Sequence, residues 1–590
     1  MSHTRTYIVL IIWHSILLLA APLIGKGRID LLDNRANIVF QITHMESLKK
    51  TFESSSLHRL WHHPRMRPFI NQGKILEAIA KDLFIQDPIR NQSDEIFTHI
   101  KSQMEQFNGE IVIGINIEPK GHLYAIAEMD SEEYRNIRSL EEKLKELEYI
   151  QSEIRKINIS GIPVIEEIHR KRKNHNRTFQ CHFRNNFIET TDREWLERVV
   201  VELKKSTFQD SVVPTISLKF NASLMDSLSR GNNPLPAGVL KGLGLEQLSD
   251  LKIDLHLKRS FWELVFTLKT RNRWEGFFTL FNRQAVPERH MLSYVPSDVY
   301  AYSVLRLDFN ALWSAFPEIV QNINPQMAQQ VTLGIQTANQ MFHFDLGRDL
   351  FANLEPLITT YSDMDGFKEK QLYFFHVRSQ EKAKQFFRKL FAEGTPFRSN
   401  KIVQLNPFAG HDIYRFGSVP ATTPVDQAKS HISGGPVGPF AIAVVTDGIA
   451  WGPEKMIIAH IQAGNDRNHR ENGKFYRSKM YRSMIRNIPE DASGYGMFHF
   501  SSLVKQLIGL MQNYQRMASP TPAKTEKKRE EKVSHLKAFL QNLKFSKLPP
   551  ADFISSFFDI GYQYSTVRRQ AMQSRSVIFM KKQKEGLERR

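Results

Sequence analysis

Apolar and polar positions along the chain repeat one arrangement four times, in which a short alternating stretch runs directly into a stretch with apolar residues every three or four positions. Alternation is typical of a half-buried strand, and the longer spacing is typical of an amphipathic helix. The pattern therefore predicts four strand–helix units. They occupy residues 37–52, 215–228, 300–316 and 494–511.

The separation of these units indicates an internal duplication. The first and third lie almost as far apart as the second and fourth, which one tandem duplication explains better than four independent units. Flanking elements correspond in the same way, because the strands predicted at residues 123–129 and 372–377 both lead into a helix. Asp308 and Ser501 have side chains suited to cap the helices of the third and fourth units.

Two longer elements are predicted from the same kind of spacing. Residues 130–157 are expected to form a long helix that starts at a capping box of Asp130 and Glu133 and stops at Gly161. Residues 439–461 are expected to form a hairpin that turns near Asp447. Further strands are predicted at residues 111–117 and 251–270.

These elements predict an α+β fold of two tandem related halves, each a mainly antiparallel sheet with packed amphipathic helices. The first half is expected over residues 36–290 and the second over residues 291–518. Residues 519–535 are expected to be a charged linker. Residues 536–590 carry strand-like apolar positions that should return to the sheet of the second half, followed by a basic tail.

The N-terminus has the pattern of a secretory signal. Arg5 precedes an apolar run over residues 7–24, and small residues follow it. We expect residues 1–25 to be a signal peptide and the mature protein to be periplasmic or secreted. The run is also long enough to span a bilayer, so an uncleaved signal anchor that holds the protein at a membrane is the alternative.

Composition favours a large folded body with anionic partners. The chain has 590 residues, of which 41% are apolar and 24% charged, an ordinary globular profile. Its formal net charge of +18 favours anionic lipid, an acidic envelope polymer or nucleic acid as partner, and export disfavours nucleic acid. Cys181 is the single cysteine, which excludes an intramolecular disulfide and a cysteine-based zinc motif. Composition leaves the oligomeric state open.

Several segments resemble an uncharacterised family of exported bacterial proteins that is known only as a domain of unknown function. The likeness lies in an L-x-R-L-W-x-x-P-x-x-x-P-F element at residues 57–69, and in residues 347–350, 372–391 and 548–565. The resemblance extends over nearly the whole mature chain and implies a secreted or periplasmic protein of two halves. It implies no activity, cofactor or catalytic residue.

Two basic segments are the candidate binding sites for an anionic partner. Residues 169–177 contain no acid and lie between the predicted long helix and a strand, and residues 467–486 interleave cations with aromatic rings. Such segments suit phosphates or polyanions, although a solvated loop and an ordinary helix with its rings facing the core are simpler alternatives. The candidate residues are Arg170, Lys171, Arg172, Lys173, Arg177, Arg470, Lys474, Tyr476, Arg477, Tyr481 and Arg482.

Two patterns are weak indications of a metal site. His58 and His62 share one face of a predicted helix, and Asp363 and Asp365 could help to bind a hard cation. Neither pattern has the remaining ligands that a site requires. A short surface helix explains the histidines better, and the rest of a calcium-binding loop is absent around the aspartates, so the sequence predicts neither a metal site nor a cofactor.

A catalytic serine is also weakly indicated. Ser-x-x-Lys can place an amine beside a serine nucleophile, but the same spacing arises at any capped, lysine-rich helix, and no partner motif accompanies it. The pattern occurs at residues 47–50, 379–382 and 502–505. The sequence therefore predicts no catalytic residue.

The sequence favours an exported envelope protein that acts as a non-enzymatic binding or structural module. A carrier of a lipid or other hydrophobic molecule is the alternative, because a Phe-rich body of sheets and helices could enclose an apolar cavity. A hydrolase is the third hypothesis, and it requires histidine, carboxylate and serine groups from distant segments to converge in one cleft.

Overall fold

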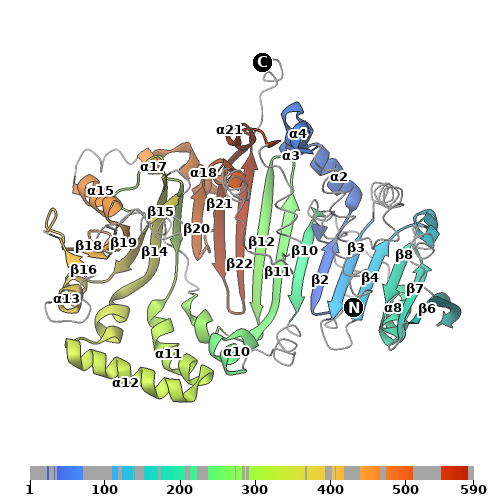
Figure 1. Cartoon of the computed structure of the whole chain (residues 1–590), viewed down its shortest axis with the longest axis horizontal. Coiled ribbons are helices and arrows are strands. Elements are labelled where there is room, and N and C mark those ends of the chain that lie inside the picture. Colours follow the sequence, from blue (N-terminus) through green and yellow to red (C-terminus); the bar gives the residue numbers. More distant parts are fainter. Residues whose placement is uncertain are drawn as a thin grey trace, which may run out of the picture.

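The computed structural model shows a chain built around one large antiparallel sheet (Figure 1). The structure describes residues 23–24, 32, 36–70, 109–116, 122–136, 138–139, 152–170, 175–205, 213–221, 237–272, 274–281, 286, 292–365, 368–392, 402–405, 407–416, 439–465, 474–505, 507–508 and 547–581. Within these ranges the main sheet has twenty strands. Every pairing is antiparallel, so the predicted α+β class is confirmed.

The first half of the chain supplies the sheet from one edge to its middle. From that edge inward the strands are β5 (Ser152–Ile159), β6 (Ile162–Arg170), β7 (His175–Phe183), β8 (Asn186–Thr190), β4 (His122–Glu128), β3 (Ile111–Asn116), β2 (Ile38–Ile42), β10 (Ile216–Asn221), β11 (Leu248–Leu257) and β12 (Phe261–Thr270). The strand β12 therefore lies at the centre of the sheet.

The second half supplies the remaining strands. From the middle outward they are β22 (Ala571–Met580), β21 (Phe558–Val567), β20 (Gly494–Phe498), β13 (Ala301–Leu305), β14 (Leu354–Asp365), β15 (Lys368–Val377), β19 (Gly448–Pro453), β18 (Phe440–Val445), β17 (Ile413–Phe416) and β16 (Ile402–Gln404). The two halves join where β12 pairs with β22.

The two halves have the same strand order when they are read outward from this central pair. In chain order each half contributes one strand, a hairpin, a four-strand meander, another strand and a final hairpin. The strand β10 lies beside β2 as β20 lies beside β13, and β8 lies beside β4 as β19 lies beside β15. Two copies of one α+β unit would produce this arrangement.

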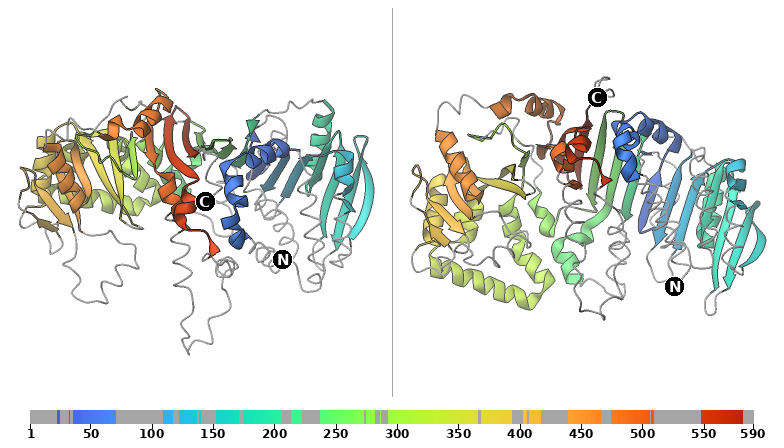
Figure 2. Two further views of the ribbon diagram at one scale, coloured as in Figure 1. Left: turned by 90° about the horizontal axis from the view of Figure 1, so that it is seen from above. Right: turned by 45° about the horizontal axis from the view of Figure 1, so that its top comes forward.

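Helices cover both faces of the sheet (Figure 2). Residues directly opposite each other in an antiparallel ladder share a face, so the registers connect the faces of the two halves. One face carries α8 in the first half, and α15, α17 and α18 in the second. These helices are α8 (Arg193–Lys205), α15 (Glu454–Asn465), α17 (Lys474–Arg477) and α18 (Lys479–Asn487).

A second set of helices covers the opposite face of the sheet. Their apolar side chains pack mainly at the ends of the strands. They are α2 (Met45–Glu53), α3 (Ser56–His62), α4 (Arg67–Ile70), α13 (Gln380–Leu390) and α21 (Ala551–Ser555). A further group along the lower edge of Figure 1 consists of α10 (Ala237–Leu243), α11 (Phe309–Ile323) and α12 (Pro325–Phe342).

The four predicted strands are confirmed as β2, β10, β13 and β20, and helices follow the first, third and fourth of them. Residues 222–236, where the second helix was expected, lie outside the described residues. The cap at Asp308 is confirmed, because its carboxylate accepts the Ala311 N–H at 2.8 Å. The cap at Ser501 is wrong: Ser501 lies inside its helix, and the His499 carbonyl closes the first turn.

The predicted long helix is wrong in its second part. Residues 131–136 and 138–139 are helical, but residues 152–159 form β5, which pairs with β6 along its length. Gly161, with a φ of 82°, lies in the turn of that hairpin instead of ending a helix. In this segment, pairing between two neighbouring strands that are rich in β-branched residues outweighs the helical spacing of the apolar residues. Residues 140–151 lie outside the described residues.

The predicted hairpin at residues 439–461 is half correct. β18 and β19 pair and turn near Asp447, as expected. The chain after Pro453 is the helix α15, not a continuing strand, with Ile457 and Ile461 buried one turn apart. Proline cannot donate to a ladder, and buried residues four positions apart suit a helix that packs on the sheet.

The two ends of the chain are described only in part. Leu23 and Ile24 form β1, which pairs with β9 (Val213–Pro214), while the rest of the predicted signal segment lies outside the described residues. The expected linker and basic tail also lie outside them, and the C-terminal strands pair with β20 as expected and with β12 in addition. Of the described helices, none has the length and apolar character to cross a membrane.

Removing β22 should weaken the coupling between the two halves, because β22 is the strand of the second half that pairs with β12 in the described sheet. A chain that ends before Ala571 is expected to unfold in two calorimetric transitions and at a lower temperature than the full chain. A chain that ends after Lys581 keeps β22 and serves as the control. A single, unshifted transition for the shorter chain would contradict this role of β22.

Candidate functional site

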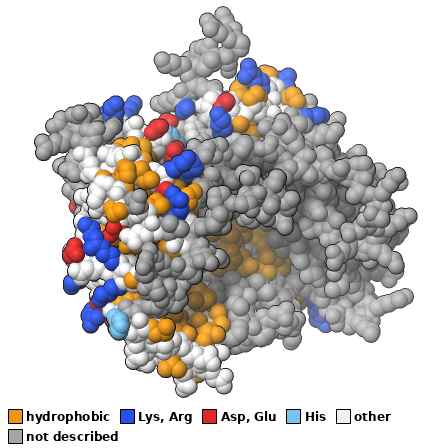
Figure 3. Space-filling model, turned by 60° about the vertical axis from the view of Figure 1, so that its left-hand side comes forward, with side chains coloured by type: hydrophobic (Ala, Val, Ile, Leu, Met, Phe, Trp, Pro, Cys, Tyr) orange, Lys and Arg blue, Asp and Glu red, His pale blue; other side chains and the backbone are white. Residues whose placement is uncertain are grey.

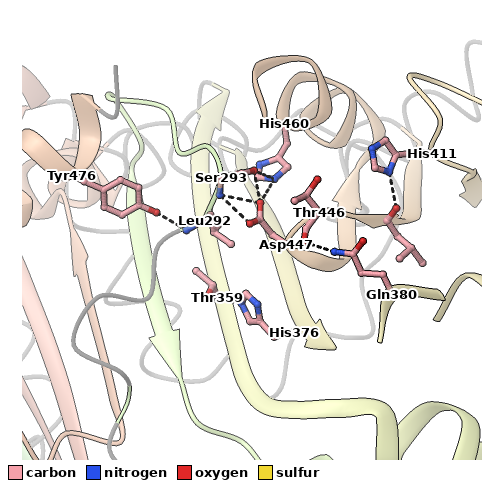
Figure 4. A network of polar contacts seen from close by, with 11 residues as sticks. Leu292, Ser293, Thr359, His376, Gln380, His411, Thr446, Asp447, His460 and Tyr476 are labelled. Carbon is pink, nitrogen blue, oxygen red and sulfur yellow. Dashed lines mark hydrogen bonds and ion pairs between the residues drawn. The ribbon is translucent and has the colours of Figure 1, made fainter. Parts of the chain in front are cut away.

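A serine, an aspartate and a histidine from distant segments meet at the β18–β19 turn (Figure 4). The Ser293 hydroxyl donates to Asp447 Oδ2 at 2.5 Å, and His460 Nε2 lies 2.8 Å from the same oxygen. The Ser293 backbone N–H also donates to both carboxylate oxygens at 3.0 Å. These are the residue types that a hydrolase would bring together, and no spacing in the sequence indicates that they meet.

The turn between β18 and β19 fixes the position of Asp447. Gly448 follows it with a φ of 125°, where side chains are disfavoured, and a Cβ there would lie 2.4 Å from the Phe375 carbonyl oxygen. His460 is fixed from α15, with its ring centroid 4.5 Å from that of Phe374. Both polar groups are therefore held by packed backbone elements.

Burial and hydrogen bonding shift the pKa of Asp447 in opposite directions, and its side chain is 12% exposed. Burial by itself raises the pKa of the carboxyl group. The contacts from His460 and Ser293 outweigh that effect, so the pKa of Asp447 lies below its ordinary value. A carboxylate at this position is accordingly ionised and fully engaged at neutral pH.

The geometry of this cluster is that of a structural hub. In a nucleophile–base pair, one histidine nitrogen accepts the serine proton while the other donates to the carboxylate. Here the serine hydroxyl donates to Asp447, and Ser293 Oγ and Asp447 both face the same nitrogen of His460. The His460 Nδ1 atom is buried and has no hydrogen-bond partner among the described residues. The arrangement therefore does not activate Ser293.

Further polar contacts join neighbouring segments around this cluster (Figure 4). Most are side chain–backbone hydrogen bonds, which fix chain positions without leaving a group free for chemistry. Tyr476 Oη accepts the Leu292 N–H at 2.8 Å, Gln380 Nε2 donates to the Thr446 carbonyl at 2.6 Å, His411 Nδ1 lies 2.8 Å from the Val444 carbonyl, and Thr359 Oγ1 lies 3.0 Å from His376 Nε2.

The first basic segment begins in β6 and ends in β7, so it does not follow a helix as expected. Arg170 ends β6, and Arg177 lies in β7. Arg177 Nη1 donates to Glu166 Oε1 at 3.0 Å, so part of its charge is already compensated. The candidates at residues 171–173 lie outside the described residues.

The second basic segment folds as α17 and α18, and its rings and cations separate. Tyr481 is buried in the core of the second half beside Tyr302, and the hydroxyl of Tyr476 holds the Leu292 N–H. These two candidate rings therefore belong to the core and do not form an exposed stacking surface. The exposed cations of these helices are Lys474, Arg477, Lys479, Arg482 and Arg486, and Arg470 lies outside the described residues.

The two basic segments do not form one surface. β6 and β7 lie near one edge of the sheet, while α18 packs beside β20, close to the middle. Figure 1 shows them well apart.

The weaker patterns have structural roles. His58 and His62 stack within α3, with ring centroids 3.9 Å apart, and Asp363 lies in β14 opposite Lys370. Ser379 caps α13 by accepting the Lys382 N–H, as a capping serine would. Among the described residues, no group of three or more histidine, cysteine or carboxylate side chains could hold a metal ion.

Comparisons with known proteins assign no family. No family model and no curated protein matches the chain. Among solved structures, crystal form IV of TP0453 matches with a TM-score of 0.22 and 8% identity, covering 41% of this chain and 80% of that one. Crystal form I of TP0453 matches with a TM-score of 0.19 and 12% identity, covering 43% and 83%. At these TM-scores the likeness supports no conclusion about fold or function.

Replacing Asp447 should destabilise the fold without affecting any chemistry. We expect Asp447→Asn to lower the free energy of unfolding at pH 7 by about 1–3 kcal/mol, because it weakens a buried, charge-assisted network. A carboxyl group with a depressed pKa stabilises the fold above its unfolded pKa, and this stability is lost as pH falls through the folded pKa. The difference from wild type should therefore shrink below about pH 4. Denaturant unfolding across this pH range measures it.

The exposed Asp559, changed to Asn, provides a control with the same loss of charge. Equal destabilisation by both variants would contradict the proposed hub. Covalent labelling of Ser293 by a fluorophosphonate would contradict the conclusion that this serine is not activated.

Proposed function

We propose that this protein is an exported, non-enzymatic envelope module that binds an anionic surface through α17 and α18. The observation that supports this proposal most directly is a set of exposed cations on these two helices. We call this set the α17–α18 basic face, and it consists of Lys474, Arg477, Lys479, Arg482 and Arg486.

The basic face follows from the periodicity of the two helices. In α18, Lys479, Arg482 and Arg486 recur at spacings of three and four, so they share one side of the helix. The opposite side buries Tyr481 and Met484. Because the apolar side is packed in the core, the cations are displayed from a fixed scaffold.

The cations of the basic face have no partner among the described residues. None of the five side chains makes an ion pair or hydrogen bond with another described residue, whereas many other cations of the protein are paired. The acids that flank the two helices in sequence are Glu471, which lies outside the described residues, and Glu490 and Asp491, of which Asp491 faces Arg568 at 3.5 Å. Exposed cations that have no partner in the described part of a chain of net charge +18 favour a dense anionic partner such as lipid headgroups or an acidic polymer.

Neutralising three cations of the basic face should weaken binding to anionic vesicles. Each basic residue near such a surface contributes about 1 kcal/mol, so replacing Arg477, Arg482 and Arg486 with Ala should reduce the partition coefficient about 100-fold. Co-sedimentation of the mature chain with phosphatidylcholine vesicles, with and without phosphatidylglycerol, measures this effect. Binding should also fall as salt is raised.

The matched control replaces Lys241, Lys382 and Lys455, which are exposed cations on three other helices, and changes the net charge equally. Equal losses in both triple variants would show that net charge alone drives binding and would sink the proposed site. If the wild-type chain bound an acidic polysaccharide but not anionic vesicles, the partner would be the polymer and the basic face would remain the site.

A carrier of a hydrophobic molecule is the second candidate function. The sheet face opposite α8 and α15 favours it. Two rows of apolar side chains cross β2, β10, β11 and β12 on that face and end at serines of β22. Leu264 in the second row is 41% exposed, which is unusual for an apolar side chain in the middle of a sheet. The rows are Phe40–Leu218–Ile253–Phe266–Ser574 and Ile42–Ile216–Leu255–Leu264–Ser576.

If this face holds an apolar ligand, native mass spectrometry of protein from its own host should show added mass that is released on unfolding. Leu264→Gln should remove most of that mass, because it places an amide in the apolar row. Leu507→Gln changes a similarly exposed leucine on a helix and should have no effect. A bare chain mass for the wild type would end the carrier hypothesis.

A further inference from the structure

The helix α12 has a composition unlike the rest of this basic protein. Residues 309–342, which span α11 and α12, contain Glu318 as their single charged residue, although 24% of the chain is charged. The helix α12 itself has no charged residue. It begins at an Asn324 cap and ends at His343 in the left-handed conformation, so its length is well defined.

One side of α12 packs on the protein and the other faces outward. Ala328 is buried, and Val331, Ile335 and Ala338 continue the same inward side at helical spacing. Met327, Leu333 and Met341 are 50%, 64% and 61% exposed. The helix forms the lower edge of the molecule in Figure 1, and the lowest part of the surface in Figure 3 is orange and white, without blue or red.

The outward residues have an arrangement that suits a two-fold axis. Met327 and Met341 lie at equal sequence distances, two helical turns, on either side of Gly334. A Cβ at Gly334 would meet no atom within 4 Å, so that position is open to an approaching backbone. An antiparallel copy of α12 that crosses at Gly334 would therefore place each Met327 against the other copy's Met341.

We propose that α12 is a self-association surface, through which two copies of this chain pair in antiparallel fashion about a two-fold axis at Gly334. A two-fold interface is self-complementary, so it brings like residues near each other. On a chain of net charge +18, most surfaces would oppose such pairing, whereas the uncharged α12 does not. Apolar side chains together with a lack of charge are also typical of the core of protein interfaces.

The length of α12 sets the expected strength of this dimer. An 18-residue helix is about 27 Å long. A contact limited to one such helix from each copy lies at or below the low end of stable interfaces, which bury about 1,200–2,000 Å² in total. The dimer should therefore dissociate on dilution, with a dissociation constant on the order of micromolar.

Cross-linking through a single introduced cysteine tests this geometry. The native Cys181 gives little background, because burial raises its pKa to about 12 and keeps the thiol unreactive. In the mature chain, Gly334→Cys places two thiols next to the axis, where mild oxidation should convert most of the protein to a disulfide-linked dimer. Gln336→Cys is exposed on another side of the same helix and should remain monomeric under the same conditions.

Sedimentation velocity over a concentration series provides the second measurement. The wild-type chain should shift from monomer to dimer as concentration rises, and Met327→Glu combined with Met341→Glu should abolish the shift. Gln336→Glu adds charge to the same helix and should preserve it. Monomeric wild type at the highest concentration, or equal cross-linking at positions 334 and 336, would overturn the proposal.

Discussion

The pairing of β12 with β22 is the constraint on which the rest of the structure depends. Its register runs from Phe261 opposite Phe579 to Lys269 opposite Ala571. Without it, two central strands would each expose a row of unpaired backbone groups, which is costly and prone to aggregation. Because β22 comes from the end of the chain, one C-terminal strand closes the second half and covers the edge of the first. In the described sheet only β5 and β16 remain as edges.

Because the two halves share one strand order, equivalent strands can be compared, and their side chains differ on one face of the sheet. The face opposite α8 and α15 is apolar in the first half, where Phe40 and Leu218 are opposite each other on neighbouring strands. On that same face β13 and β20, the equivalent strands of the second half, have small residues, such as Gly496 opposite Ser303. Side chains at Gly496 would meet the Tyr302 carbonyl within 3 Å, so close packing of β20 on β13 requires glycine there. The halves therefore share a backbone arrangement but differ in the side chains of these equivalent strands.

Local periodicity was sufficient to predict the class of fold and the strands β2, β10, β13 and β20, because alternation is a property of neighbouring residues. It failed at residues 152–159 and 454–461, where the outcome depends on which strand or core lies alongside. The meeting of Ser293 with Asp447 and His460 could not be predicted for the same reason, since it depends on the register of the whole second half. The sequence identified the cations of α18 together with Tyr481 as candidates. Only the structure shows that the cations are exposed whereas Tyr481 is buried.

Packing also explains why the proposed binding surfaces can act independently. The α17–α18 basic face rests on the aromatic core around Tyr302 and Phe475, whose rings are 4.9 Å apart, so its cations move with the sheet. The helix α12 rests on α11 at the lower edge of Figure 1, away from α17 and α18. A dimer formed through α12 would leave both basic faces exposed. Two basic faces carried by one assembly would bind an extended anionic surface more tightly than one face alone, because the second contact forms at high effective concentration.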